Sequence, residues 1–342
     1  MNLKIDIEER VLHFKQPAGT SRGIYTERRI WLVRVSDGQH VGVGECAPLP
    51  LLSCDDIPNY GERLRMFCND VEQKGKLDVD ALRDYPSMMF GLETALLNLK
   101  NGERLFDTAF SRGEEGIPIN GLVWMGSYEE MMRRIEQKLS QGFHCVKLKI
   151  GAIDFDAELE LLKMIRKRFG PRDVELRVDA NGAFKYEEDA LYKMELLSQY
   201  ALHSIEQPIR AGQWSYMAEL CRDAPLPIAL DEELIGVNAP DQKRQMLNVI
   251  RPRYIVLKPS LHGGMAGVRE WVDVACDMGI GSWITSALES NVGLYAIAQL
   301  CSALYGSHIK MPQGLGTGQL FTDNIIMPLE IRGEMLWITR NF

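Results

Sequence analysis

The chain has 342 residues, which suggests about two domains at the usual ~150 residues per domain. Hydrophobic residues make up 46% and charged residues 25%, a composition that supports a large buried core and excludes disorder as the main state. Lys and Arg number 39 against 47 Asp and Glu, a net charge of −8. This acidic balance, without a basic run interleaved with aromatic residues, argues against a nucleic-acid partner.

Neither a membrane partner nor an oxidising compartment is predicted. No apolar stretch reaches the ~18 residues that a membrane span needs. The first ten residues, MNLKIDIEER, alternate polar and apolar side chains and indicate a first strand rather than a signal peptide. The seven cysteines are widely spaced without a CxxC pair, so a disulfide framework or structural zinc site is not expected. A reducing cytoplasm fits this pattern best.

Residues 1–117 are interpreted as an α+β domain. Strand-like alternation covers 5–14 and 29–37, a third strand starts at 41, and helical periodicity follows at 59–73 and 87–102. A small-residue loop, 16–23, separates the first two strands. Its glycines and Arg22 suit a mobile lid over an anionic substrate, with an ordinary surface turn as the alternative.

From residue 118 to 320 short β-branched runs alternate with amphipathic ones. This order predicts an α/β fold with parallel strands and crossover helices: a modified TIM-type (β/α) barrel, with a doubly wound open sheet as the competitor. Residues 321–342 have strand character and are expected to return to the N-terminal region, completing a capping domain. The eight predicted barrel strands lie at 117–122, 146–150, 175–179, 203–207, 227–231, 254–258, 281–286 and 308–312.

Five of these strands carry a charged side chain at or next to their last residue. The residues are Lys149, Asp179, Glu206, Asp231 and Lys258, spaced 25 to 30 residues apart, about one βα unit each. Catalytic groups of (β/α) barrels lie at the C-terminal ends of the strands. The spacing therefore predicts one charged group per strand, all at the same level of the barrel mouth.

Three carboxylates that converge repel one another unless a hard divalent cation lies among them. Mg²⁺ suits an all-oxygen set, and Mn²⁺ is expected to substitute for it. The lysines then suit acid–base chemistry, because a carboxylate substrate at such a cation has a more acidic α-C–H. Lys147 shares a strand face with Lys149, so either could be the base, although Lys149 is nearer the strand end. The alternative is that these charges are solvated caps or ion pairs.

Five short motifs in this order resemble the enolase superfamily, in its muconate-lactonizing-like subgroup. The resemblance implies a barrel under a capping domain, with one Mg²⁺ held by Asp179, Glu206 and Asp231. It also implies that Lys149 and Lys258 are the catalytic lysines on either side of the substrate. The motifs are Lys147-Leu148-Lys149, Val178-Asp179-Ala180-Asn181-Gly182, Ile205-Glu206-Gln207-Pro208, Leu230-Asp231-Glu232 and Leu257-Lys258-Pro259.

Two later segments, TSALESNVG at 285–293 and QGLGTG at 313–318, are similar to one branch of this subgroup. That branch forms 2-succinylbenzoate for menaquinone synthesis, by removing water from a cyclohexadiene carboxylate that carries a succinyl arm. The resemblance implies a carbon–oxygen lyase with a small-molecule carboxylate as its partner. The oligomeric state is not predicted. Substrate contacts are predicted for Lys147, Ser260, Ser286, Glu289 and Gly316.

Other reactions remain open at this point. Racemisation of N-succinylamino acids would use the same metal and lysines and differs only in lacking a β-hydroxyl leaving group. Dipeptide epimerisation is disfavoured, because residues 316–318 are Gly-Thr-Gly where that activity needs Asp-x-Asp, and the next acid is Asp323. A non-catalytic barrel that serves as a scaffold is the alternative from a different class.

Overall fold

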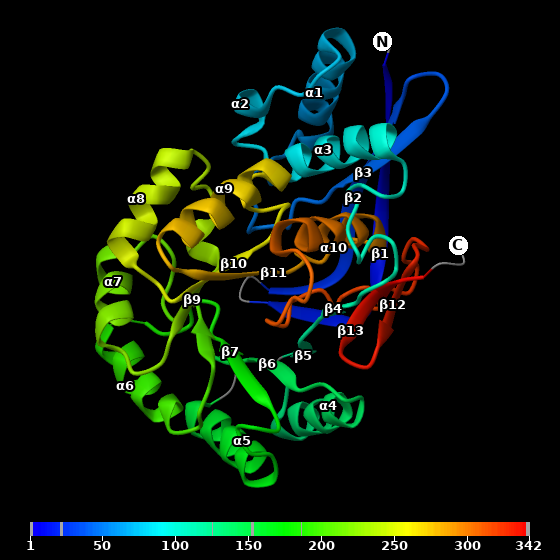
Figure 1. Ribbon diagram of the computed structural model, residues 1–342. Coiled ribbons are helices and arrows are strands. Elements are labelled where there is room, and N and C mark those ends of the chain that lie inside the picture. Colours follow the sequence, from blue (N-terminus) through cyan, green and yellow to red (C-terminus); the bar gives the residue numbers. More distant parts are fainter. Residues whose placement is uncertain (1–2, 21–22, 125, 152–153, 186, 340–342) are drawn as a thin grey trace.

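The structure is a computed structural model that describes residues 3–20, 23–124, 126–151, 154–185 and 187–339 (Figure 1). Arg22 of the predicted lid therefore lies outside the described residues. Within these ranges, no helix combines the length and apolar character needed to cross a membrane.

The N-terminal region forms a three-stranded antiparallel sheet in the order β1-β2-β3. The strands are β1 (Lys4–Thr20), β2 (Gly23–Ser36) and β3 (Val41–Cys46). The segment predicted as a loop is mostly strand, because β1 continues to Thr20 after an irregularity in pairing between His13 and Ala18. The helices of this region are α1 (Tyr60–Lys74), α2 (Val79–Leu82) and α3 (Pro86–Asn101).

Helix α3 lies directly on β3 because glycines remove the side chains between them. A Cβ at Gly44 would lie 1.9 Å from the carbonyl oxygen of Gly91, so a larger residue would force the helix away from the sheet. This close packing fixes the segment that follows β3, which reaches the mouth of the barrel.

The parallel strands of the second sheet follow chain order, from β5 to β11 (Figure 1). Every neighbouring pair is parallel, as the alternating sequence pattern predicts. The strands are β5 (Gly121–Val123), β6 (Cys145–Lys149), β7 (Glu175–Asp179), β8 (Ser204–Glu206), β9 (Ile228–Leu230), β10 (Tyr254–Leu257) and β11 (Gly281–Ile284).

The eighth predicted strand, 308–312, is not a strand in the structure. Two residues just beyond it close the sheet through isolated parallel bridges, Gln313 with Ile119 and Gly314 with Thr285. Pro312 has no N–H to donate to a ladder, which explains why pairing starts only after it. The barrel is therefore closed by a very short last segment.

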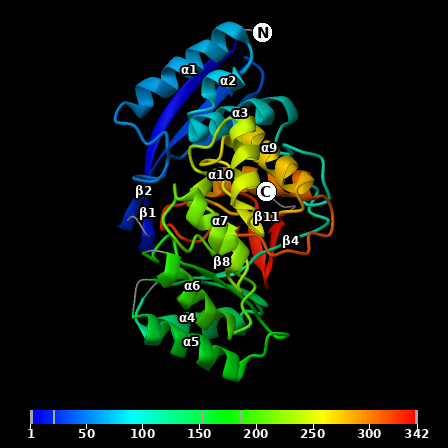
Figure 2. The same ribbon diagram turned by 90° about the vertical axis from the view of Figure 1, so that its left-hand side faces the viewer.

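Helices lie around the outside of the parallel strands, as Figures 1 and 2 show for α4 to α8. The start of α4 is set by a capping box, in which the Ser127 hydroxyl accepts from the Glu130 N–H and the Glu130 carboxylate accepts from the Ser127 N–H. The helices are α4 (Tyr128–Ser140), α5 (Phe155–Arg168), α6 (Glu187–Ser198), α7 (Trp214–Asp223), the short 3₁₀ helix η1 (Glu232–Leu234), α8 (Pro240–Ile250), α9 (Gly264–Asp277) and α10 (Asn291–Tyr305).

The C-terminal segment forms a hairpin of β12 (Leu329–Arg332) and β13 (Met335–Ile338). β13 pairs with β4 (Ile117–Pro118), which leads into the first barrel strand. Just before the hairpin, Phe321 forms a bridge with Phe14 of β1. The chain end thus contacts both the entry to the barrel and the N-terminal sheet, and the domain limits 1–117, 118–320 and 321–342 stay predictions.

The N-terminal region is held on the barrel by an apolar cluster and by two carboxylates, one fully buried and one partly buried. Leu12, Leu49 and Leu288 belong to the shared apolar cluster. Glu45 accepts from the backbone N–H of Ser290 at 2.8 Å, at the start of α10. Glu93 accepts from the first turn of α9, including the Ala266 N–H at 3.0 Å. Acceptors at helix N-termini satisfy otherwise unpaired N–H groups, so these carboxylates orient the two parts.

Candidate active site

Three of the predicted site residues lie side by side on adjacent strands. Lys149 pairs in register with Asp179, and Asp179 pairs in register with Glu206. Their side chains therefore point to the same face, the interior of the barrel mouth. The predicted common level holds for these three.

The other two charged residues lie further along their strands. Glu206 is level with Ala229, two residues before Asp231. Leu230 is in turn level with Ile255, so Asp231, the next residue, comes two residues short of the level of Lys258. A shift of two residues keeps each side chain on the interior face, and such a stagger accompanies the tilt of strands in a closed barrel. The prediction of a single level is therefore wrong for Asp231 and Lys258, which lie progressively further toward the C-terminal ends of their strands.

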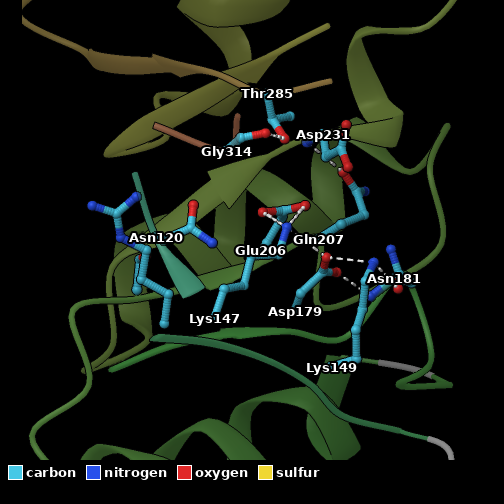
Figure 3. A network of polar contacts seen from close by, with 12 residues as sticks. Asn120, Lys147, Lys149, Asp179, Asn181, Glu206, Gln207, Asp231, Thr285 and Gly314 are labelled. Atoms are coloured by element: carbon cyan, nitrogen blue, oxygen red, sulfur yellow. Dashed lines mark hydrogen bonds and ion pairs between the residues drawn. The ribbon is translucent and has the colours of Figure 1, made fainter. Parts of the chain in front are cut away.

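The lysines of β6 lie among the carboxylates (Figure 3). Lys147 Nζ donates to both oxygens of Glu206, at 2.7 and 2.6 Å, and lies 2.8 Å from Asp179 Oδ2. Lys149 Nζ lies 2.7 Å from the same Asp179 oxygen and donates to Asn181 Oδ1 at 2.7 Å. Asp179 is consequently shared by the two lysines.

This network shifts the carboxyl groups in opposite directions. Burial alone would raise the pKa of Asp179, but the charges of Lys147 and Lys149 lower it well below the ordinary value. The pKa of Glu206 is raised well above its ordinary value, first by burial and then by the neighbouring Asp179 charge. Burial and the Asp179 charge thus both oppose a charged Glu206 in this network.

Lys258 forms an ion pair with Asp231 on the neighbouring strand. Although burial opposes both charges, the pair raises the pKa of Lys258 and lowers that of Asp231, so both stay charged. The backbone N–H of Lys258 donates a hydrogen bond to Nδ1 of His262 at 2.9 Å. Burial lowers the pKa of His262 to about 3, so this histidine is neutral and holds the end of β10 rather than serving as a surface group.

The residues fit a divalent metal ion by their donor chemistry. In the described ranges no three His, Cys, Asp or Glu residues are gathered closely enough to form a ready metal centre. The Lys147 ammonium lies between the carboxylates of Asp179 and Glu206. Asp231 Oδ1 and Glu232 Oε2, however, are buried without a hydrogen-bond partner in the described chain. Unpaired carboxylate oxygens beside other acids are suited to a hard cation such as Mg²⁺.

The three lysines open onto a cavity of about 90 Å³. Ser286 and Gly316, two of the predicted substrate contacts, also line it. Other walls come from the N-terminal region, which brings Leu49 and Leu52 to the barrel mouth. The remaining lining residues are Asn120, Leu122, Trp124, Asn181, Glu232, Trp283, Thr285, Ala287, Leu288, Gly314 and Thr317.

Ser260 and Glu289 lie elsewhere than predicted. Neither is among the residues that line the cavity, and both side chains are fully buried. The Ser260 hydroxyl donates to Glu289, whose second oxygen accepts from the Ala287 N–H at 2.6 Å. The pair is therefore consumed in supporting the cavity wall at Ala287 rather than facing a ligand.

Two polar residues of the site, Asn181 and Glu232, belong to the sequence motifs but were given no role there. Asn181 accepts from Lys149 and donates to Glu232 Oε1 at 2.9 Å, so it links β6 to the segment after β9. Its backbone φ is +46°, a conformation that Asn tolerates better than most residues. Its position two residues after Asp179, in the loop at the C-terminal end of a barrel strand, is the signal that could have identified it.

Comparison with known proteins places this architecture among enolase-like enzymes. The family described as "Enolase C-terminal domain-like" matches residues 130–337. A dipeptide epimerase from Enterococcus faecalis, crystallised with Mg and the dipeptide L-Leu-L-Tyr, superimposes with a TM-score of 0.82 at 17% identity, covering 99% of this chain and 97% of that one. At that identity the likeness concerns the fold. The modified barrel with its capping region, predicted from the sequence, is confirmed.

The more specific comparisons point to one branch. The family described as "MenC, N-terminal domain" matches residues 20–99. An o-succinylbenzoate synthase from Desulfotalea psychrophila is 46% identical over 96% of this chain and 97% of its own. The crystal structure of MenC from that organism has a TM-score of 0.84 at 42% identity, covering 99% and 100% of the two chains. This chain therefore belongs to the o-succinylbenzoate synthase family, which confirms the predicted lyase class.

A racemase is also among the relatives. An N-succinylamino acid racemase from Thermus thermophilus is 30% identical, over 80% of this chain and 75% of its own. Its identity to this chain is lower than the 46% of the synthase from Desulfotalea psychrophila.

Proposed function

We propose that this chain is a Mg²⁺-dependent o-succinylbenzoate synthase. Its substrate would be a succinyl-hydroxycyclohexadiene-carboxylate and its product 2-succinylbenzoate, a step of menaquinone biosynthesis. Family membership over nearly the whole chain carries this proposal. The lysines and carboxylates at the barrel mouth supply the groups that an α-proton abstraction needs.

The proposed base is Lys149, acting in its neutral form. Its Nζ takes the α-proton of the substrate, and the electrons of that C–H bond form a ring double bond as the neighbouring C–O bond breaks. Lys149 then returns the proton to the departing hydroxide, which leaves as water. Asn181 Oδ1, 2.7 Å from the Lys149 nitrogen, holds the amine in place for both transfers.

Lys258 is proposed to remain an ammonium ion. It reaches the same cavity from β10, on the other side of the barrel from β6. Its Asp231 partner keeps the pKa raised, so its charge is retained while negative charge develops on the substrate. Because the product ring is aromatic, the elimination needs little assistance beyond a base and charge stabilisation.

Asp179, Glu206 and Asp231 are the proposed holders of one Mg²⁺, with Mn²⁺ able to replace it. When bound, the cation supplies Lewis-acid stabilisation of a carboxylate whose α-proton is being removed. Lys147 keeps Glu206 and Asp179 oriented. Ser286 and Gly316 are proposed to contact the substrate directly, whereas Ser260 and Glu289 would act through the wall that they support.

Racemisation of N-succinylamino acids is the second candidate, favoured by the Thermus thermophilus relative. It would use the same base and the same metal, without loss of water. A cytoplasmic location is also proposed, and the seven cysteines, all free in the structure, support it.

The test is turnover of the cyclohexadiene substrate with Mg²⁺, followed by ultraviolet absorbance as the ring aromatises, with a parallel sample in EDTA. Rapid turnover that EDTA abolishes is the expected result. If the Mg²⁺ sample shows no turnover, the synthase proposal is withdrawn, and racemisation of N-succinylamino acids becomes the reaction to assay.

A further inference from the structure

Gln207 follows Glu206 at the end of β8 and is fully buried, yet it is not among the residues that line the active-site cavity. Its backbone φ is +41°, in the left-handed region that residues other than Gly, Asn and Asp seldom adopt. Such a conformation persists only where surrounding contacts fix it. The turn at Gln207 is therefore held by its neighbours rather than by the preference of the residue itself.

This turn directs the main-chain carbonyl of Gln207 away from β9. The Gln207 N–H donates to the Ala229 carbonyl at 2.9 Å. The next bond of a regular parallel ladder would therefore join the Asp231 N–H to the Gln207 carbonyl. That carbonyl instead accepts from the Gly182 N–H at 2.6 Å, in the segment after β7. The buried Asp231 N–H thus needs another acceptor, because leaving such a donor unpaired is costly.

The side chain of Gln207, part of the network in Figure 3, supplies that acceptor. Its Oε1 accepts from the Asp231 N–H at 3.2 Å and from the Glu233 N–H at 3.1 Å. Its Nε2 donates to the Ile209 carbonyl and to Glu233 Oε2, both at 3.0 Å. A side-chain amide has two donor hydrogens and two acceptor lone pairs, so all four are used. Gln207 is fully engaged with the chain itself.

These bonds join all three segments that carry the proposed metal ligands. Gln207 is the residue after Glu206, and its amide oxygen holds the backbone of Asp231. Its main-chain carbonyl holds the segment that follows Asp179. Asp231 needs such support because its φ of −126° and ψ of −81° belong to neither a regular strand nor a helix. Contacts that orient metal ligands in this way are worth about 10- to 100-fold in metal affinity.

We propose that Gln207 is a positioning residue that sets the spacing of Glu206 and Asp231, and thereby the affinity of the site for a divalent cation. The inference rests on the proposed function, because it takes these two carboxylates as metal ligands. Gln207 touches neither substrate nor cation in this role. It acts through the backbone, where its side-chain oxygen replaces the carbonyl that the turn removes from the ladder.

Calorimetric titration of the metal-free chain with Mg²⁺ provides the test. Gln207→Met keeps the length of the side chain without its four hydrogen bonds, and we expect its dissociation constant for Mg²⁺ to rise about 10- to 100-fold. The matched control is Gln299→Met. Gln299 of α10 is equally buried, and its amide bonds the Leu105 N–H and the Glu103 carbonyl. Gln299→Met should lower the melting temperature but bind Mg²⁺ as the wild type does.

The Mg²⁺ dependence of turnover gives a second readout. The Mg²⁺ concentration for half-maximal turnover should rise in Gln207→Met by a factor similar to that of the dissociation constant. Excess Mg²⁺ should restore most of the rate, because the catalytic lysines are unchanged. Loss of a merely structural contact would lower the melting temperature without moving this concentration.

A polarity swap keeps the proposal testable if Gln207→Met does not fold. Gln207→Glu places a carboxylate against that of Glu233 and should weaken Mg²⁺ binding. Adding Glu233→Gln restores a donor opposite the new carboxylate, which still accepts from the Asp231 N–H. The double variant should therefore recover most of the lost Mg²⁺ affinity.

The outcomes separate this inference from the proposed function. Wild-type Mg²⁺ affinity in Gln207→Met and Gln207→Glu, or an equal loss in Gln299→Met, would overturn the role of Gln207 and leave the proposed function intact. A wild type that binds no Mg²⁺ would remove the metal from the proposed function and this inference with it. A wild type that binds Mg²⁺ but does not turn over the cyclohexadiene substrate would remove only the proposed reaction.

Discussion

Replacing each lysine of β6 by methionine should separate the chemical step from the stability of the fold. Lys147 and Lys149 both contact Asp179, but only Lys147 also holds Glu206. In Lys149→Met, Asp179 keeps its partner at 2.8 Å, so the loss of unfolding free energy should be small, about 1–2 kcal/mol. Turnover should nevertheless fall by about 100- to 10,000-fold, the usual contribution of a general base.

In Lys147→Met the loss of stability should be the larger effect. Glu206 would lose its ion-pair partner inside the barrel, and breaking such a buried pair costs about 3–5 kcal/mol. For a chain of 342 residues this corresponds to a fall in melting temperature of about 4–7 °C. Methionine approximates the length of the lysine stem, so the effect reports mainly on the charge.

The assay pairs thermal unfolding in EDTA with turnover in Mg²⁺. EDTA keeps metal binding from masking differences in stability. The reasoning is refuted if Lys149→Met keeps near wild-type turnover, or if it destabilises the fold more than Lys147→Met does. The first result would transfer the role of base to Lys147, which geometry on the strand face also allows.

Three further outcomes are expected. Removing divalent metal should abolish turnover, and Mg²⁺ or Mn²⁺ should restore it. Saturating Mg²⁺ should also raise the melting temperature, because only the folded chain brings the carboxylates together. A melting temperature that does not respond to Mg²⁺ would count against the assigned ligands. Burial raises the pKa of Glu93 from 4.5 to about 7, so the stability that this protonated group contributes is complete below pH 4.5 and is lost as pH rises through about 7. Urea unfolding should show Glu93→Gln gaining on the wild type by on the order of 3 kcal/mol across that window, and parallel pH profiles would contradict this. Arg28 is buried and donates to the carbonyls of Ala47 and Leu288, in the segments after β3 and β11. Arg28→Met should therefore lower the free energy of unfolding in urea by about 2–5 kcal/mol and raise KM more than it lowers kcat. An unchanged KM would show that these two segments do not need Arg28 to shape the cavity.

The sequence was informative wherever the chemistry follows strand periodicity. The five charged residues at strand ends could be found by their spacing, because parallel strands joined by helices repeat every 25 to 30 residues and present their C-terminal ends on one face. The motifs around Asp179 and Glu206 then indicated the superfamily. The last strand was misplaced, because a closure by single bridges at Gln313 and Gly314 leaves no alternating pattern to detect.

Substrate contacts were harder to predict because they depend on segments that are distant along the chain. Glu289 is charged and follows a strand, which predicts exposure to a ligand, yet its side chain is fully buried and accepts from the Ser260 hydroxyl of another barrel loop. Conversely, Leu49 reaches the cavity only because β3 and α3 are held tightly together. Neither outcome has a local signal.

The sequence by itself therefore determined the fold class, the charged strand ends and the family of this protein, since each depends on local periodicity or on motifs in order. Only the tertiary structure decided how the lysines divide the carboxylates among themselves, and which loops enclose the cavity. Such pairings arise from barrel stagger and from contacts between distant segments, which no stretch of sequence contains.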